Sequence, residues 1–342
     1  MNKTNIQKNI YYDASGQVQT ISFGRDINSI LGDILGDDFR AYRKQWDRAT
    51  NFELVTGYPT YVTFEMNCSC NLKCRMCLFG VPRSKWYAVP AKREFPVEKA
   101  KEIIREGVPL GLRSIGVSYW GEPLLKKGII EFCRWAREHG IVDIIFVTNA
   151  TLLTKKISEA ILDSGITRLR FSLDAVSKKL YEKIRVGAKY EITHNNIFEF
   201  LRLKKERGCL LPVTSANFVL MEMNEHEVND FVAFWGKKVD YVVIQQLVNY
   251  PLITAPKAKS RVIVKKFRCS QPFQRLAIRA DGMVVPCCNG FGEKIALGNV
   301  FRESIKKMWH SKKENYLRRI HKRGEYYKDP VCLECASAST VS

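Results

Sequence analysis

Three closely spaced cysteines are the residues in this chain whose type and spacing best suit chemistry. Cys70, Cys74 and Cys77 follow the pattern C-x3-C-x2-C. Thiolates this close together can bind one face of a small metal cluster, and a four-iron cluster held by three thiolates keeps one iron open. An open iron suits catalysis, whereas a closed metal site would be structural. A closed zinc site is the alternative, with Cys68 as its fourth ligand.

A second group of cysteines lies near the C-terminus. Cys269 and Cys287 flank Gly282 in the pattern C-x12-G-x4-C, and Cys332 and Cys335 form a later C-x2-C pair. The Asp-Gly pair that ends at Gly282 is a hairpin signal, and such a turn would bring Cys269 and Cys287 together. Four thiolates can close one metal cluster, although four cysteines with one C-x2-C pair also suit tetrahedral zinc.

Alternating strands and helices in the middle of the chain would position the first group. Strands are predicted at residues 61–66, 114–119, 143–148, 168–173, 213–220 and 241–247, and helices at 96–107, 124–139, 154–164, 191–207 and 225–237. Repeated β/α alternation predicts a parallel sheet whose site lies at the C-terminal ends of the strands. About six units, rather than eight, predict a partial barrel.

The predicted fold class is therefore α/β, a partial (β/α)6 TIM-like barrel followed by a small α+β cluster domain. We expect an N-terminal extension over residues 1–58, which includes a helix at 37–50, and the barrel over residues 59–249. The helical pattern then breaks at a proline-containing linker over residues 250–266. Residues 267–342 are basic, rich in short strands and contain the second cysteine group.

The composition excludes several classes of protein. Hydrophobic residues make up 46% of the chain and charged residues 26%, which excludes a disordered or collagen-like protein. No apolar run is long enough to cross a membrane, and residues 1–12 hold no apolar signal core, so we expect a cytoplasmic protein. The chain has 11 cysteines, and without an export signal they favour metal binding or thiol chemistry over disulfides.

The charge balance is strongly basic, with 55 Lys and Arg residues against 35 Asp and Glu residues and a formal net charge of +20. A solvated basic surface is the simplest interpretation. An anionic substrate, an acidic peptide or a membrane surface is the alternative, and we do not expect a nucleic-acid partner.

The first cysteine group, placed directly after the first strand of a β/α barrel, resembles the radical S-adenosylmethionine (SAM) superfamily over residues 60–250. The resemblance implies a SAM-binding 4Fe-4S cluster on Cys70, Cys74 and Cys77. The residues that match the family's SAM-contacting positions are Met76, Gly121, Glu122, Pro123, Asn149, Ser172, Asp174 and Arg185. Core packing is the alternative for Met76, helix capping for Asn149, Ser172 and Asp174, and a surface-helix role for Arg185. One departure from the family is Trp120, where a glycine is common.

The second cysteine group resembles the SPASM and twitch cluster modules of the same superfamily. The resemblance implies one auxiliary 4Fe-4S cluster on Cys269, Cys287, Cys332 and Cys335, as in the shortened twitch variant. Cys288 is a spare thiol in this module and is the candidate hydrogen-atom donor to a substrate radical. A small buried residue with no chemical role is the alternative for Cys288.

The resemblance also implies a reaction. Radical SAM enzymes cleave SAM reductively to a 5′-deoxyadenosyl radical, which abstracts a hydrogen atom from the substrate. A closed auxiliary cluster can accept an electron, so the favoured function is oxidation (dehydrogenation) of a small sugar or aminocyclitol-like substrate. The alternatives are a peptide- or protein-modifying maturase of the thioether, epimerisation or formylglycine type, and a sugar epimerase with a thiol hydrogen donor. A non-catalytic cluster or zinc module that docks an anionic partner is a further alternative.

The resemblance implies partners as well. We expect a small-molecule substrate, which the basic surface would suit if it is anionic, or a peptide. A flavodoxin- or ferredoxin-type protein is the expected electron donor.

Overall fold

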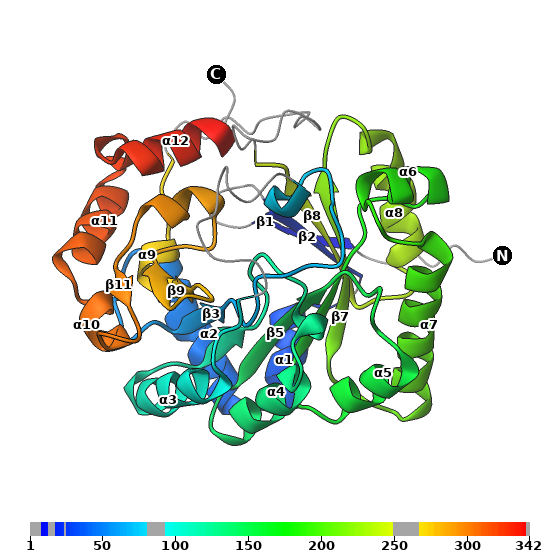
Figure 1. Cartoon of the computed structure of the whole chain (residues 1–342), viewed down its shortest axis with the longest axis horizontal. Coiled ribbons are helices and arrows are strands. Elements are labelled where there is room, and N and C mark those ends of the chain that lie inside the picture. The colour runs from blue at the N-terminus through cyan, green and yellow to red at the C-terminus, as the bar shows by residue number, and fades with distance from the viewer. Residues whose placement is uncertain (1–7, 13–17, 24, 81–92, 249–266, 340–342) are drawn as a thin grey trace.

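The described strands form one continuous sheet of eleven strands in a computed structural model (Figure 1). The structure describes residues 8–12, 18–23, 25–80, 93–248 and 267–339, and the predicted linker at 250–266 lies outside the described residues. The strand order is β1-β2-β8-β7-β6-β5-β4-β3-β9-β10-β11. Strands β3 to β8 pair in parallel with their sequence neighbours, and the described sheet does not close on itself. The prediction of a partial barrel is confirmed.

The bounds of the elements follow the chain. The strands are β1 Lys8–Tyr12, β2 Val18–Phe23, β3 Tyr61–Phe64, β4 Ser114–Gly116, β5 Asp143–Thr148, β6 Arg168–Ser172, β7 Val213–Leu220, β8 Tyr241–Gln246, β9 Arg275–Ile278, β10 Met283–Val285 and β11 Gly298–Asn299. The helices are α1 Ile27–Leu35, α2 Asp37–Thr50, α3 Val97–Gly107, α4 Ile129–Glu138, α5 Lys155–Leu162, α6 Lys178–Ile184, α7 Tyr190–Glu206, α8 Val228–Trp235, α9 Gln271–Gln274, α10 Ile305–Trp309, α11 Lys312–Arg323 and α12 Pro330–Ser339.

Alternate residues of the parallel strands build the main core. Val62, Phe64, Phe146, Leu169 and Phe171 are fully buried and pack in one apolar cluster with residues of the crossover helices. Burying these side chains is the main driving force for this layer. Among the described residues, no helix is both long and apolar enough to cross a membrane.

The N-terminal segment is part of the barrel. Strands β1 and β2 form an antiparallel hairpin, and β2 pairs antiparallel with β8. Helices α1 and α2 pack on the other face of the sheet, where Leu31 and Phe39 join an apolar cluster with Tyr241 and Val243. The sequence predicted the helix at 37–50 but not the hairpin or helix α1.

The C-terminal segment continues the same sheet. Strand β9 pairs in parallel with β3, although about 210 residues separate them, and β10 turns back antiparallel on β9. The turn places Gly282 at φ +83°, a conformation that side chains rarely adopt, and the Arg279 amide donates to the Met283 carbonyl oxygen at 2.8 Å. The predicted hairpin is confirmed. Helices α10, α11 and α12 form the outer layer of this segment, on the left in Figure 1.

Candidate functional site

The loop after β3 holds the first cysteine group against helix α6. The Lys73 amide donates to the Val186 carbonyl oxygen at 2.9 Å, and the Arg75 amide donates to the Ile184 carbonyl oxygen at 3.0 Å. Within the loop, the Cys77 amide donates to the Cys74 carbonyl oxygen at 3.1 Å. These backbone bonds fix the loop at the C-terminal ends of the strands, where the sequence placed the site.

The three thiols lie close together, and each receives a hydrogen bond. The Leu72 amide lies 3.4 Å from the Cys70 Sγ, the Phe79 amide 3.5 Å from the Cys77 Sγ, and the Arg185 Nη1 3.7 Å from the Cys74 Sγ. Burial raises the pKa of Cys70 to about 11 and that of Cys77 to about 12, and the neighbouring Cys74 adds to both rises. Such thiols need a bound metal to stay deprotonated, and N–H donors to sulfur are typical of cluster sites.

Asp174 fixes Arg185 beside this loop. The Arg185 Nη2 lies 2.5 Å from Asp174 Oδ2, and the Val219 amide donates to Asp174 Oδ1 at 2.7 Å. Arg185 is thus a buried ion-pair partner and not a surface-helix residue. Its Nε is buried and has no hydrogen-bond acceptor in the described part of the chain. An unpaired guanidinium N–H beside the cysteine loop fits the carboxylate of a bound SAM molecule.

Glu122 connects the ends of β4 and β5. Its carboxylate accepts hydrogen bonds from the Thr148 hydroxyl at 2.7 Å, the Asn149 amide at 2.8 Å and the Leu124 amide at 3.2 Å. Burial raises the pKa of Glu122 to about 7 despite these donors. The Asn149 side chain in turn donates to Asn71 Oδ1 at 2.9 Å and lies 3.9 Å from the Cys70 Sγ. Glu122 therefore positions Asn149 beside the first cysteine group.

Gly121 packs tightly against the segment that leads into the cysteine loop. A Cβ atom at Gly121 would lie 2.5 Å from the Asn67 carbonyl oxygen and 2.7 Å from the Ser69 carbonyl oxygen. The Glu122 amide also donates to the Ser69 carbonyl oxygen at 2.9 Å. The absence of a side chain at Gly121 thus serves the packing of two backbone segments, a reason that the sequence did not reveal.

The remaining predicted SAM-contacting residues occupy different surroundings. Met76 is 9% exposed and belongs to the main apolar cluster, as its core-packing alternative expected. Pro123 begins a short 3-10 turn after Glu122, and Ser172 is the last residue of β6. All three lie at the C-terminal side of the sheet, where the strands end.

The second cysteine group is assembled from three separate segments. Cys269 precedes α9, Cys287 follows β10, and Cys332 and Cys335 lie one turn apart on α12. Burial raises the pKa of Cys287 well above its usual range, and the neighbouring Cys335 and Cys269 add to the rise. Burial also raises the pKa of Cys332, and the neighbouring Cys269 and Cys335 add to this rise. The fold thus brings all four predicted ligands into one neighbourhood.

His321 on α11 joins two of these cysteines, and sequence reasoning missed it. The Cys269 amide donates to His321 Nδ1 at 3.2 Å, so the other ring nitrogen carries the hydrogen. That nitrogen, Nε2, lies 3.4 Å from the Cys332 Sγ. Burial lowers the pKa of His321 to about 4, which keeps the ring neutral. No local pattern in the sequence marks this residue, because its partners are far away in the chain.

The numbers of cysteines in the two groups match the ligand numbers of two four-iron clusters. Three lie on one loop and four come from three segments. Within the described ranges, no three His, Cys, Asp or Glu side chains are arranged to hold one metal ion.

Cys288 is exposed, so the alternative of a small buried residue is wrong for this cysteine. Its Sγ lies 3.8 Å from Arg275 Nη1 and 3.7 Å from Gln271 Oε1. The other cysteines without a ligand prediction differ from it, since Cys68 and Cys133 are buried and Cys209 is half-buried. Cys288 is thus the accessible spare thiol near the second group.

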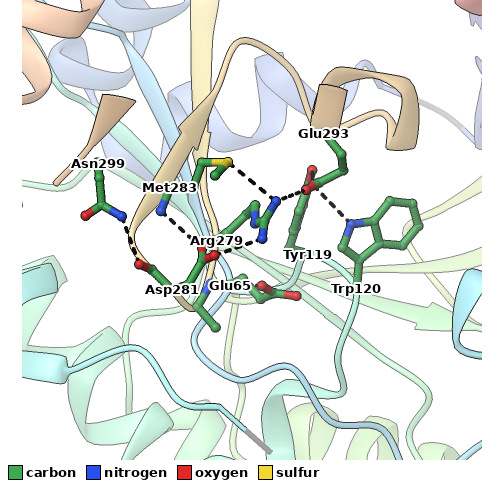
Figure 2. A network of polar contacts seen from close by, with 9 residues as sticks. Glu65, Tyr119, Trp120, Arg279, Asp281, Met283, Glu293 and Asn299 are labelled. Atoms are coloured by element: carbon green, nitrogen blue, oxygen red, sulfur yellow. Dashed lines mark hydrogen bonds and ion pairs between the residues drawn. The ribbon is translucent and has the colours of Figure 1, made fainter. Parts of the chain in front are cut away.

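A buried polar network joins the two cysteine regions (Figure 2). Glu293 accepts hydrogen bonds from the Tyr119 hydroxyl and the Trp120 indole N–H, both on the loop that precedes Gly121. Its other oxygen lies 3.1 Å from Arg279 Nη1, and Arg279 Nη2 lies 2.8 Å from Asp281. Burial raises the pKa of Glu293, and Tyr119 and Arg279 oppose the rise. The loop after β4 and the C-terminal hairpin are therefore held together by a shared carboxylate.

Comparison with known families identifies both halves of this site. Residues 65–234 match the family model of the radical SAM superfamily, and residues 269–336 match that of the SPASM iron-sulfur cluster-binding domain. A radical SAM domain implies SAM and a SAM-binding 4Fe-4S cluster, and a SPASM domain implies auxiliary iron–sulfur clusters.

Individual relatives agree with this assignment at the level of the fold. A GTP 3′,8-cyclase from Thermodesulfovibrio yellowstonii is 35% identical over 178 residues, which is 51% of this chain and 51% of that protein. The chain thus spans about half the length of the curated relatives that it matches. SuiB from Streptococcus suis, bound to S-adenosylmethionine, superposes with a TM-score of 0.63 at 14% identity, over 91% of this chain and 89% of SuiB.

A third similarity covers both halves of the chain. BtrN in complex with AdoMet and 2-DOIA superposes with a TM-score of 0.51 at 20% identity, over 83% of this chain and 94% of BtrN. With the two family matches, and with both cysteine groups gathered as described, the protein belongs to the radical SAM superfamily and carries a SPASM iron–sulfur domain.

Proposed function

We propose that this protein is a radical SAM oxidoreductase that dehydrogenates a small polyhydroxylated substrate of the sugar or aminocyclitol type. In this proposal Cys70, Cys74 and Cys77 bind the SAM-cleaving cluster, and Cys269, Cys287, Cys332 and Cys335 bind one auxiliary cluster. When bound, these groups supply hydrogen-atom abstraction from the substrate and an acceptor for one electron.

The residues around the first cysteine group have positioning roles in this proposal. Arg185, held by Asp174, offers its free Nε to the SAM carboxylate, and Asn149, held by Glu122, borders the same loop. Gly121 keeps the neighbouring backbone segments close together. Met76, Pro123 and Ser172 complete the proposed SAM surroundings at the ends of the strands.

The single observation that supports the oxidative outcome is that the second cysteine group draws four cysteines from three segments of the fold. Four thiolates would fill all the protein-ligand positions of one four-iron cluster and leave none open for substrate. A closed cluster suits electron transfer. Removing a hydrogen atom from a carbinol carbon, a proton from its hydroxyl group and one electron gives a carbonyl. We further propose a flavodoxin- or ferredoxin-type electron donor and a cytoplasmic location.

The test uses anaerobically reconstituted enzyme with a panel of sugars, amino sugars and aminocyclitols in deuterium oxide. We expect formation of 5′-deoxyadenosine together with a product that is lighter by two hydrogens and carries no carbon-bound deuterium. Cys288→Ala should stay active, as should the control Cys209→Ala.

A different result would favour a thiol-dependent epimerase. In that case the product is an isomer of the substrate in which one carbon-bound hydrogen is replaced by deuterium, because a thiol exchanges its hydrogen with the solvent. Cys288→Ala would then lose turnover while still forming 5′-deoxyadenosine, and Cys209→Ala would not. A modified peptide, found with a precursor peptide as substrate, would instead support the maturase alternative.

A further inference from the structure

Two arginines share the inner face of the partial barrel. Tyr61 on β3 pairs with Arg275 on β9, and Val147 on β5 pairs with Arg170 on β6. Residues of the opposite parity on these strands, such as Val62 and Phe171, form the outer core beneath the helices. Arg170, Arg275 and Tyr61 therefore point to the inner side of the sheet.

Aromatic rings hold Arg275 in place without neutralising its charge. Its guanidinium carbon lies 5.0 Å from the ring centroid of Trp46 on α2 and 4.9 Å from that of Tyr61. Its Nη1 approaches the exposed Cys288, and its Nε is buried without a hydrogen-bond acceptor among the described residues. Cation–π contacts orient a guanidinium but leave its N–H groups free to bind an anion.

Arg170 resembles Arg275 in having a guanidinium Nε without a hydrogen-bond acceptor among the described residues. This Nε is also buried, and no carboxylate in the described part of the chain pairs with it. Burial raises the pKa of the Tyr61 hydroxyl, and the positive charges of both Arg275 and Arg170 oppose that rise.

A neighbouring arginine shows what a structural role on this face looks like. Arg168 lies 3.0 Å from Asp143 and donates to the Asn28 side chain at 2.9 Å, so its charge is neutralised within the protein. Arg170 and Arg275 lack such a partner among the described residues, although they are only partly exposed. Holding two largely buried cations without a counter-ion is costly, and a bound anion removes that cost.

We infer that Arg170 and Arg275 bind an anionic group of the substrate, a phosphate or a carboxylate, on the inner face of the barrel. This inference rests on the proposed function, because it narrows the polyhydroxylated substrate to an anionic one. It also assigns a substrate-binding role to part of the positive charge of the chain. Cys288, which contacts Arg275, then lies beside the bound substrate.

The test is a binding measurement that needs no turnover. Pyrophosphate and citrate are titrated into the reconstituted holoenzyme by calorimetry, which distinguishes a phosphate from a carboxylate preference. We expect one of them to bind, and Arg170→Met and Arg275→Met each to raise its Kd by about tenfold or more. Arg275→Lys, which keeps the charge, should recover part of the affinity. Iron content checks that each variant is folded.

Arg105→Met is the matched control. Arg105 also stacks on an aromatic ring, with its guanidinium carbon 5.0 Å from the centroid of Trp135, but it lies on the exposed surface of α3. The variant Arg105→Met should leave the Kd of the bound anionic probe unchanged. Absence of binding by both probes, or equal weakening in all variants including Arg105→Met, would overturn the inference.

The binding result and the proposed function can fail separately. If anion binding depends on both inner arginines but no substrate of the panel is dehydrogenated, the inference stands and the oxidation proposal fails. If neutral sugars are dehydrogenated equally by wild type and by both arginine variants, the proposed function stands and the inference fails.

Discussion

The two cysteine groups of this protein are built in opposite ways. Cys70, Cys74 and Cys77 lie on one loop, which backbone hydrogen bonds fix to the end of α6. The second group draws its four cysteines from before α9, after β10 and on α12. The first group therefore needs only a local turn on a finished barrel, whereas the second forms only when the whole C-terminal segment has folded.

The difference extends to the hydrogen bonds at the sulfurs. The first group receives N–H donors from its own loop, at Leu72 and Phe79. The second group depends on His321, whose ring links Cys269 with Cys332 across the segment. The first group also receives one donor from far along the chain, since Arg185 Nη1 lies 3.7 Å from the Cys74 Sγ, but the other two sulfurs receive theirs within the loop.

The largest effects are expected from removing ligands. Replacing Cys70, Cys74 and Cys77 by Ala should abolish SAM cleavage but leave roughly four of roughly eight iron atoms, because the second group lies on other segments. The paired variant Cys332→Ala/Cys335→Ala should lose the other four and still cleave SAM. For both variants, iron analysis measures the cluster content and 5′-deoxyadenosine formation measures SAM cleavage. Loss of all the iron in the first variant would mean that the two groups are not independent.

The next largest effect is expected at the network between the two regions. Glu293→Ala removes one of the two carboxylates that pair with the buried Arg279, which should cost about 3 kcal/mol of unfolding free energy. Glu303→Ala is the control, because Glu303 pairs with the exposed Lys307 and should cost less than about 1 kcal/mol. Chemical denaturation of the anaerobic holoenzyme compares the two. Equal costs would show that the network does not hold the regions together.

Two glycines test the packing of each region. Gly121→Ala should push apart the segments at Asn67 and Ser69 and weaken SAM binding, while Gly292→Ala should displace the Cys287 sulfur and lower the auxiliary iron. The steric overlap of each added Cβ atom should lower the free energy of unfolding by about 1–3 kcal/mol. Gly57→Ala is the control, since its Cβ would lie 3.7 Å from the nearest atom, an ordinary contact. SAM affinity unchanged by Gly121→Ala would contradict the tight packing.

The smallest effect concerns pH in the first region. Burial raises the pKa of Glu122 from 4.5 to about 7, so the folded state holds this proton more tightly than the unfolded state. The resulting stability is present at low pH and is lost as the pH rises through about 7. Relative to Glu122→Gln, wild type should lose about 1 kcal/mol of unfolding free energy between about pH 6 and 7.5. A constant difference between the two proteins would contradict a raised pKa.

The sequence predicted the parallel strands and the cysteine groups because local patterns encode them. Buried strands such as Asp143–Thr148 are short apolar runs, and the spacing of Cys70 to Cys77 is a signal in itself. The hairpin of β1 and β2 gave no such signal, and only its pairing with β8 shows its role. Residues that act through distant partners were likewise missed.

Glu293 and His321 illustrate that limit. Glu293 meets Tyr119 about 170 residues away, and His321 meets Cys269 about 50 residues away. Neither lies in a motif, so only the folded chain reveals them. The predicted SAM-contacting residues came from the resemblance to the family, but the packing reason for Gly121 and the exposure of Cys288 are visible only in the folded chain.

The pairing of β9 with β3 sets an order of events during synthesis. Strand β3 leads into the first cysteine loop, yet its second neighbour is made only when residues 275–278 have been translated. At about 5–20 residues per second, the ribosome needs about 10 to 40 s to reach them. For that time β3 is an edge strand with unpaired backbone groups, open to association with other nascent chains.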